Sequence, residues 1–436
     1  MAILLVFAQT KAFGMIIAQD IAKKKKEDFW AGMCYAEQVG RCLKGSSSVL
    51  RRTGKELLMN KVILVPDSFK GTMSSREICE IMKQEILAFY PKAQVLPIPV
   101  ADGGEGTVDS FLAAAGGEKV TVPATGPHFA PVEGFYGVLP DGTAVIEMAA
   151  AAGLPLAGGR NRPDLATTYG VGQLMAHAVL SGCRKMIVGL GGSATNDGGA
   201  GAAAALGVVF RNEKGESFLP TGGTLEQIAA IDTDGMLPAL RETDLVVMCD
   251  IDNPLCGPGG AAAVFGPQKG ADPDMVRRLD RNLAHLAGVI KRDLGKEISW
   301  IPGSGAAGGM GGGMAAFFDA RLQMGIDAVL DTVHFEELAG GADLVFSGEG
   351  KLDQQSLRGK VVIGAARRAK KLGVPLIAVV GDIADDIEAV YGEGVSAVFS
   401  INRAAIPYEQ AKERARSDLA LTMNNLMRWF SHFGRI

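Results

Sequence analysis

The chain has 436 residues, of which 47% are hydrophobic and 21% charged, a composition typical of a folded protein with two or three domains. A net charge of −4 leaves no basic excess to attract a nucleic-acid backbone. The six cysteines form no CxxC pair and the five histidines no HExxH motif, which disfavours Cys- or His-based metal sites. We therefore expect reduced thiols and a cytoplasmic location, with no nucleic-acid partner.

Residues 1–58 differ from the rest of the chain. The apolar run 1–7 has no preceding positive charge and is too short to span a membrane, so we expect no membrane partner. Met59 stands directly before the first strong strand pattern. We interpret 1–58 as an extension, either disordered or a non-native start, so a chain that begins at Met59 should keep its activity. A targeting arm that uses the lysine run 23–26 is the alternative.

From residue 61 onward, apolar strand patterns alternate with helical ones. Strands are expected at 62–65 and 95–100, with a helix at 75–89 that Ser74 or Ser75 caps. The segment 121–147 instead has proline, glycine and short alternating runs, and its Asp-Gly pair at 141–142 indicates a hairpin turn. Later strands are expected at 185–190, 245–248, 344–346, 376–380 and 397–400.

This order predicts an α/β fold with two domains. A doubly wound parallel-sheet domain, of Rossmann or flavodoxin-like type, is expected from both chain ends, over residues 59–124 and 320–436. A second α/β domain is expected as an insertion over residues 125–319.

A glycine-rich turn follows the strand 185–190 and precedes a helix expected at 200–206. Backbone N–H groups converge on an anion where a helix begins. The turn also carries hydroxyl and amide side chains, which disfavours the alternative that its glycines serve only sharp geometry. We expect phosphate-binding residues here and in the turn 266–270: Gly191, Gly192, Ser193, Thr195, Asn196, Gly198 and Lys269.

Acidic residues follow several expected strands directly. Open α/β sheets bind ligands beyond the carboxyl ends of their strands, where carboxylates can hold Mg²⁺ or accept a hydroxyl proton. Helix capping alone is the alternative for each position. The candidates at these strand ends are Asp67, Ser68, Lys70, Asp102, Glu105, Asp197, Asp250 and Glu349.

Two nucleotide-binding patterns receive less weight. Residues 303–308 match GxGxxG, but the preceding segment is a poor strand, so we interpret 303–313 as a mobile glycine-rich loop. The Walker A pattern is absent. Two alternatives stay open, a dinucleotide-dependent oxidoreductase that uses 303–308 and a non-catalytic anion-binding module.

The motifs at 66–71, 99–106, 191–199, 266–270 and 348–350 together resemble the type I glycerate kinase family over nearly all of residues 60–432. The resemblance implies an ATP-dependent kinase that phosphorylates D-glycerate at the 2-hydroxyl to give 2-phospho-D-glycerate. This chain departs from the family pattern at 161–163, where it reads Asn-Arg-Pro rather than Arg-Asn-Pro or Arg-Asp-Pro.

The resemblance also implies roles for the candidate residues. The turn 191–199 and Lys269 would hold the phosphates of ATP, and Lys70 would offset charge on the transferred group. Asp197 is the first candidate for the group that accepts the hydroxyl proton, and Asp250 is the second. Mg²⁺ would be bound by Asp102, Glu105 and Glu349, and glycerate by Asp67, Ser68, Arg76 and Arg162. A homodimer is left open.

Overall fold

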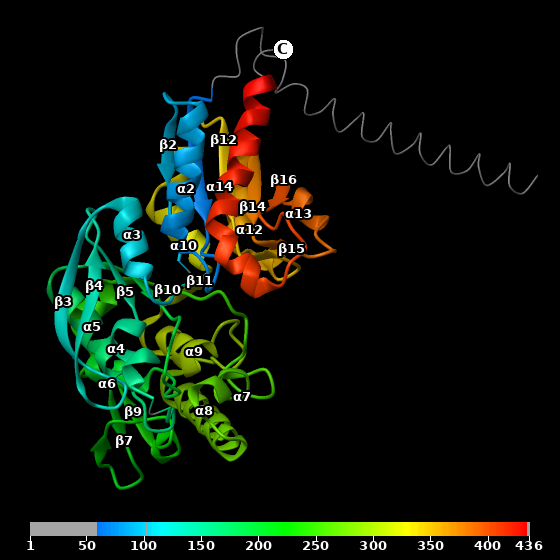
Figure 1. The fold of residues 1–436 in the computed structure, drawn as a ribbon. Helices are drawn as coiled ribbons and strands as arrows, with labels where there is room; N and C mark the ends of the chain where they lie inside the picture. Colours follow the sequence, from blue (N-terminus) through cyan, green and yellow to red (C-terminus); the bar gives the residue numbers. More distant parts are fainter. Residues whose placement is uncertain (1–58, 102, 160, 434–436) are drawn as a thin grey trace, which may run out of the picture. The chain divides into compact units, whose positions relative to one another are not determined.

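The computed structural model describes residues 59–101, 103–159 and 161–433. Residues 59–429 form one compact unit (Figure 1). The expectation about the extension 1–58 lies outside the described residues. Within the described ranges, none of the helices has both the length and the apolar character that crossing a bilayer requires.

The first sheet has five parallel strands in the order β16-β14-β12-β1-β2. The chain runs from β1 outward to β2, and later fills the other side from β12 to β16. A switch point therefore lies between β1 and β12, which is where doubly wound sheets bind ligands. The strands are β1 (Lys61–Pro66), β2 (Gln94–Pro97), β12 (Leu344–Gly348), β14 (Leu376–Val380) and β16 (Val395–Ser400).

Helices cover both faces of this sheet. Ile63 and Val65 share a hydrophobic core with helix α12 (Val361–Lys371). Because successive side chains alternate along a strand, Val62 and Leu64 point to the other face, where α2 (Ser75–Phe89) packs. Helix α14 (Tyr408–Phe433) lies beside α2, which it contacts through a hydrogen bond from Asn424 to Glu85, 2.9 Å long.

The expected start of α2 is confirmed. Ser74 is its N-cap, and its hydroxyl accepts a hydrogen bond from the Glu77 backbone N–H. The Glu77 carboxylate in turn accepts one from the Ser74 N–H. This reciprocal pair is a capping box, which satisfies two backbone donors that a helix start otherwise leaves without partners.

The second sheet is mixed, in the order β11-β10-β6-β5-β4-β3. Strands β3, β4 and β5 pair antiparallel, as the pattern of 121–147 predicts, and β5, β6, β10 and β11 pair parallel. The expected domain boundaries at residues 124 and 320 fall at the end of β3 and directly before β11, and both of these strands pair within the second sheet. The division of the chain into two domains stays a prediction. The strands are β3 (Glu118–Thr125), β4 (Pro131–Val138), β5 (Thr143–Glu147), β6 (Lys185–Gly189), β10 (Asp244–Met248) and β11 (Arg321–Gln323).

The remaining elements pack around these two sheets. The helices are α3 (Thr107–Ala115), α4 (Ala149–Ala152), α5 (Tyr169–Leu180), α6 (Ala200–Ala205), α7 (Ala261–Phe265), α8 (Pro273–Leu294), α9 (Ala306–Phe318), α10 (Gly325–Thr332), α11 (Phe335–Ala339) and α13 (Ala389–Gly392). The short strands are β7 (Val209–Arg211), β8 (Ser217–Phe218), β9 (Ala230–Asp232), β13 (Lys351–Leu352) and β15 (Asp382–Ile383). Together these elements confirm the α/β fold class.

Helix α9 corrects the interpretation of 303–313 as a loop. Most of this segment is a buried helix with a kink at Ala307–Gly309, and the element directly before it is helix α8 rather than a strand. A Cβ atom at Gly308 would lie 2.1 Å from the Thr195 carbonyl oxygen, and one at Gly313 would lie 2.1 Å from that of Gly198. The glycines therefore let α9 pack directly on the backbone of the turn 191–199.

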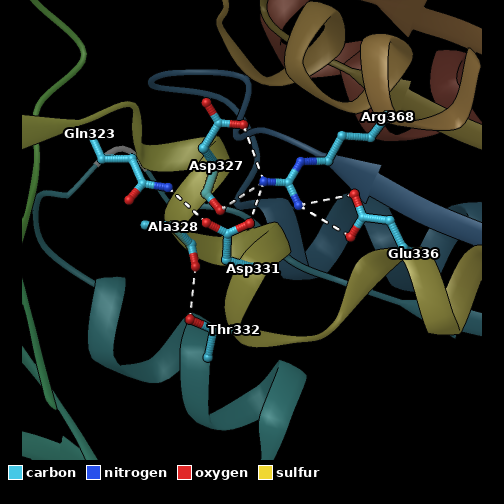
Figure 2. A network of polar contacts seen from close by, with 7 residues as sticks. All are labelled: Gln323, Asp327, Ala328, Asp331, Thr332, Glu336 and Arg368. Atoms are coloured by element: carbon cyan, nitrogen blue, oxygen red, sulfur yellow. Dashed lines mark hydrogen bonds and ion pairs between the residues drawn. The ribbon is translucent and has the colours of Figure 1, made fainter. Parts of the chain in front are cut away.

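A polar network joins the two sheets near α10 (Figure 2). Arg368 of α12 has a side chain that is only 14% exposed, and it binds Asp331 and Asp327 of α10 and Glu336 of α11. Gln323 of β11 donates a second hydrogen bond to Asp331, 2.8 Å long. Burial would raise the pKa of Asp331, but the hydrogen bonds from Arg368 and Gln323 outweigh it and lower that pKa. The positive charge of Arg368 thus offsets the negative charges of three carboxylates at once.

Replacing Arg368 by methionine should lower the free energy of unfolding by about 1–3 kcal/mol, because three neighbouring carboxylates lose their shared cation. Urea denaturation at neutral pH measures this. Arg367→Met is the matched control on the same helix, since Arg367 pairs with Glu393 in an exposed position, and its effect should stay below about 1 kcal/mol. Equal losses in both variants would contradict a special role for Arg368.

Candidate active site

A cavity of about 1060 Å³ opens at the switch point of the first sheet. The loop after β1 contributes Asp67, Ser68 and Lys70, and the loop after β12 contributes Glu349. Asp250, which follows β10 of the second sheet, lines the same cavity. The structure therefore brings together five of the predicted site residues from three separate strand ends.

Glu349 is a buried acid in the wall of this large cavity. Its side chain is 4% exposed, and its Oε1 has no hydrogen-bond partner among the described residues. Burial raises its pKa to about 7; Ser356 and Lys360 oppose the rise, whereas the charges of Asp67 and Asp353 add to it. A buried carboxylate oxygen without a partner is a position where a cation would relieve an energetic cost.

The donor set suits Mg²⁺ bound jointly by protein and phosphate. Mg²⁺ is usually held by one or two carboxylates, with phosphate oxygens and water completing its shell. Glu349, with Asp67 close enough to raise its pKa, supplies such a pair. The described part of the chain contains no group of three or more His, Cys, Asp or Glu side chains that could hold a metal ion without such phosphate ligands.

A second, smaller cavity of about 190 Å³ lies at the carboxyl ends of β6 and β10. Gly191, Gly192 and Ser193 line one side, and Lys269 and Asp250 line others. The predicted glycine turn and the lysine of the turn 266–270 therefore do meet, although 76 residues separate Ser193 from Lys269.

Lys269 is almost completely enclosed, with 3% of its surface exposed. Its Nζ donates hydrogen bonds to the Ser193 Oγ at 2.7 Å and to the Thr195 carbonyl at 2.8 Å. Burial lowers its pKa to about 7, and the charge of Asp197 opposes that shift. An anion bound in this cavity would stabilise the protonated lysine.

Asp197 lines neither cavity and is fully buried. Its Oδ2 accepts hydrogen bonds from the Thr168 N–H at 2.7 Å, the Thr168 hydroxyl at 2.9 Å and the Gly201 N–H at 3.2 Å. Its Oδ1 accepts one from the Gly199 N–H at 3.2 Å. Burial raises its pKa against these hydrogen bonds. This geometry favours a role in holding the starts of α5 and α6 in place, rather than contact with substrate.

Asp197→Asn is therefore expected to lower the free energy of unfolding by about 2–3 kcal/mol. The NH₂ group of the asparagine would face N–H or O–H groups that now donate hydrogen bonds to the Asp197 carboxylate. Denaturation curves and kcat measured on the same preparation separate the two roles. A large loss of kcat with unchanged stability would instead support Asp197 as the proton acceptor.

Several predicted residues lie elsewhere. Arg162 is held by Asp164, with Nε–Oδ1 and Nη2–Oδ2 distances of 2.8 Å, and lines neither cavity. Exposed Arg76 and Glu105 also line neither, and Asp102 lies outside the described residues. Of the glycine turn, three residues are buried beneath the small cavity rather than lining it: Thr195, Asn196 and Gly198.

Sequence reasoning missed several residues that line the large cavity. Lys360 is the N-cap of α12, and Arg358 binds Asp252 at 2.9 Å. The Gly-Lys pair at 359–360 directly before a helical pattern was an available signal. The segment 401–412 also contributes to the wall, and no local motif marks it.

Comparison with known proteins shows which family this chain belongs to. The model of the glycerate kinase family matches residues 62–431. A glycerate kinase of Bacillus subtilis (strain 168) is 45% identical over 84% of this chain and 96% of its own length. The glycerate 2-kinase of Escherichia coli (strain K12) is 41% identical over 84% of this chain and 97% of its own.

A solved structure shows the same fold. The crystal structure of a proposed glycerate kinase 2 from Salmonella typhimurium LT2 matches with a TM-score of 0.77 and 40% sequence identity, covering 86% of this chain and all of that one. With sequence and structure in agreement over most of its length, the chain belongs to the glycerate kinase family and is an enzyme of the kinase class.

Proposed function

We propose that this enzyme transfers the γ-phosphoryl group of ATP to the 2-hydroxyl of D-glycerate. The names of its relatives support the substrate, and that of the Escherichia coli protein supports the 2-position. The observation that carries the proposal is the position of Asp250, which lines both the large and the small cavity. A phosphoryl transfer requires such a place, where two bound substrates meet at one carboxylate.

In the proposed reaction, the 2-hydroxyl oxygen of glycerate forms a bond to the γ-phosphorus of ATP, and the bond to the β,γ-bridging oxygen breaks. The hydroxyl proton passes to Asp250, and ADP leaves. Asp250 Oδ1 accepts a hydrogen bond from the Gly325 N–H at 2.7 Å, which orients the carboxylate. Lys70 and Lys360 line the large cavity and would offset charge on the phosphates.

Mg²⁺ fits the site through Glu349 and Asp67, with phosphate oxygens as its further ligands. It would supply charge neutralisation on the phosphates. Glu349 binds a cation only when ionised, and its raised pKa of about 7 therefore opposes loading below neutral pH.

A cytoplasmic location is part of the proposal. Cys79, Cys183, Cys249 and Cys256 are free thiols, which supports a reducing compartment.

The direct test incubates the purified full-length chain with ATP, MgCl₂ and D-glycerate, and identifies the product by NMR. The ³¹P and ¹H spectra distinguish 2-phosphoglycerate from the 3-phospho isomer. Formation of the 3-phospho isomer would correct the position of transfer. Binding of glycerate without turnover would support an anion-binding module instead, and turnover only with NAD(P)H would support an oxidoreductase.

A further inference from the structure

We infer that the two cavities divide the substrates by size, so that the small cavity at Gly192 and Lys269 holds glycerate and the large cavity at Glu349 and Lys360 holds the nucleotide. This inference rests on the proposed function. It reverses the expectation that the glycine turn 191–199 cradles the phosphates of ATP.

Volume is the first argument. Ligand-sized pockets generally measure about 300–1,000 Å³, and the large cavity, at about 1060 Å³, lies just above that range. The small cavity, at about 190 Å³, lies below that range. Glycerate, with about seven non-hydrogen atoms, therefore suits the smaller space, whereas ATP, with roughly thirty, suits the larger one.

The chemistry of the small cavity suits a hydroxy acid. Gly192 has a φ of +74°, and its backbone N–H and that of Ser193 find no acceptor among the described residues. A protonated Lys269 has a third N–H beyond its bonds to Ser193 and Thr195. Two backbone donors and one buried cation are a suitable set for a carboxylate.

The chemistry of the large cavity suits a nucleotide. No side chain caps α12, so its backbone N–H groups are available to phosphate next to Lys360, and Val361 of its first turn lines the cavity. The buried Oε1 of Glu349, without a partner among the described residues, marks a cation position on the same wall. An apolar surface for a base completes the cavity, formed by Ile401, Ala404, Ala405, Ile406, Ala411 and Ala415.

The shared residues then define the direction of transfer. Asp250 and Ile251 line both cavities, so a hydroxyl in the small one and a γ-phosphate in the large one would meet there. If the turn 191–199 instead held the phosphates, the buried Glu349 and the start of α12 would have no ligand on their side of Asp250.

Matched charge variants of the full chain test this division. Lys269→Gln and Lys360→Gln each remove one cation, and isothermal titration calorimetry measures the Kd of D-glycerate and of ADP separately. Lys269→Gln should raise the Kd of glycerate at least about tenfold and leave that of ADP nearly unchanged. Lys360→Gln should do the opposite.

A second pair of variants covers the case in which the buried Lys269 is needed for folding. Leu154 lines the small cavity and Ile406 the large one, and both are partly exposed. Leu154→Trp should exclude glycerate alone, and Ile406→Trp should weaken ADP alone. The melting temperature of each variant checks its fold.

The outcomes separate the two proposals. Weaker ADP binding in Lys269→Gln or Leu154→Trp, with or without a loss of glycerate, overturns the inference, even if the wild type phosphorylates glycerate normally. A wild-type enzyme that neither binds nor phosphorylates glycerate overturns the proposed function, and with it the inference. The crossed pattern, with one ligand lost per cavity, supports both.

Discussion

Replacing Asp250 by asparagine is expected to lower kcat for glycerate phosphorylation by roughly 10²-fold or more, with little change in melting temperature. The amide cannot accept the hydroxyl proton, but its carbonyl oxygen can still accept the hydrogen bond from the Gly325 N–H. The side chain should therefore keep its place at the junction of the cavities while losing its role in proton transfer.

Steady-state kinetics with saturating ATP and D-glycerate, together with a thermal melt, check this prediction. Asp252→Asn is the matched control two residues away, because Asp252 lines only the large cavity and pairs with Arg358 in an exposed position. We expect at most a few-fold change in kcat for the control. Full activity of Asp250→Asn would leave the proton acceptor to another carboxylate.

Glu349→Gln is expected to inactivate the enzyme and yet stabilise its fold at pH 8. In the folded chain, burial raises the pKa of Glu349 from 4.5 to about 7. Between these two values the unfolded chain has released the proton that the folded chain keeps, so stability falls as pH rises through this window. Above pH 7 the full penalty of a buried charge is present, and the neutral glutamine does not incur it.

The expected gain in the free energy of unfolding is about 1–3 kcal/mol at pH 8 and below about 0.5 kcal/mol at pH 4.5, where the glutamate is protonated in the folded chain and about half protonated in the unfolded one. Urea denaturation without Mg²⁺ or nucleotide at the two pH values measures it. Exposed Glu337→Gln on α11 is the control and should stay within about 0.5 kcal/mol at both. A variant less stable than wild type at pH 8 would show that Glu349 supports the fold, rather than trading stability for function.

Local sequence patterns determined the strands of the first sheet, helix α2 and part of the site. The period of apolar residues and Ser74 predicted α2, because a capping box and a helical face are properties of adjacent residues. Strands that run parallel end at the same edge of a sheet, so the convergence of Asp67 and Glu349, which directly follow β1 and β12, could be predicted from the sequence alone.

Only the tertiary structure decided which polar residues lie against a cavity and which are buried beneath it. Asp197 and Ser193 lie four positions apart in one motif, yet the first accepts hydrogen bonds from Thr168 in the interior and the second lines the small cavity. The same holds for the glycines of α9, which pack on the backbone of this turn. Burial and hydrogen-bond partners depend on residues tens to hundreds of positions away, and sequence periodicity carries no information about such contacts.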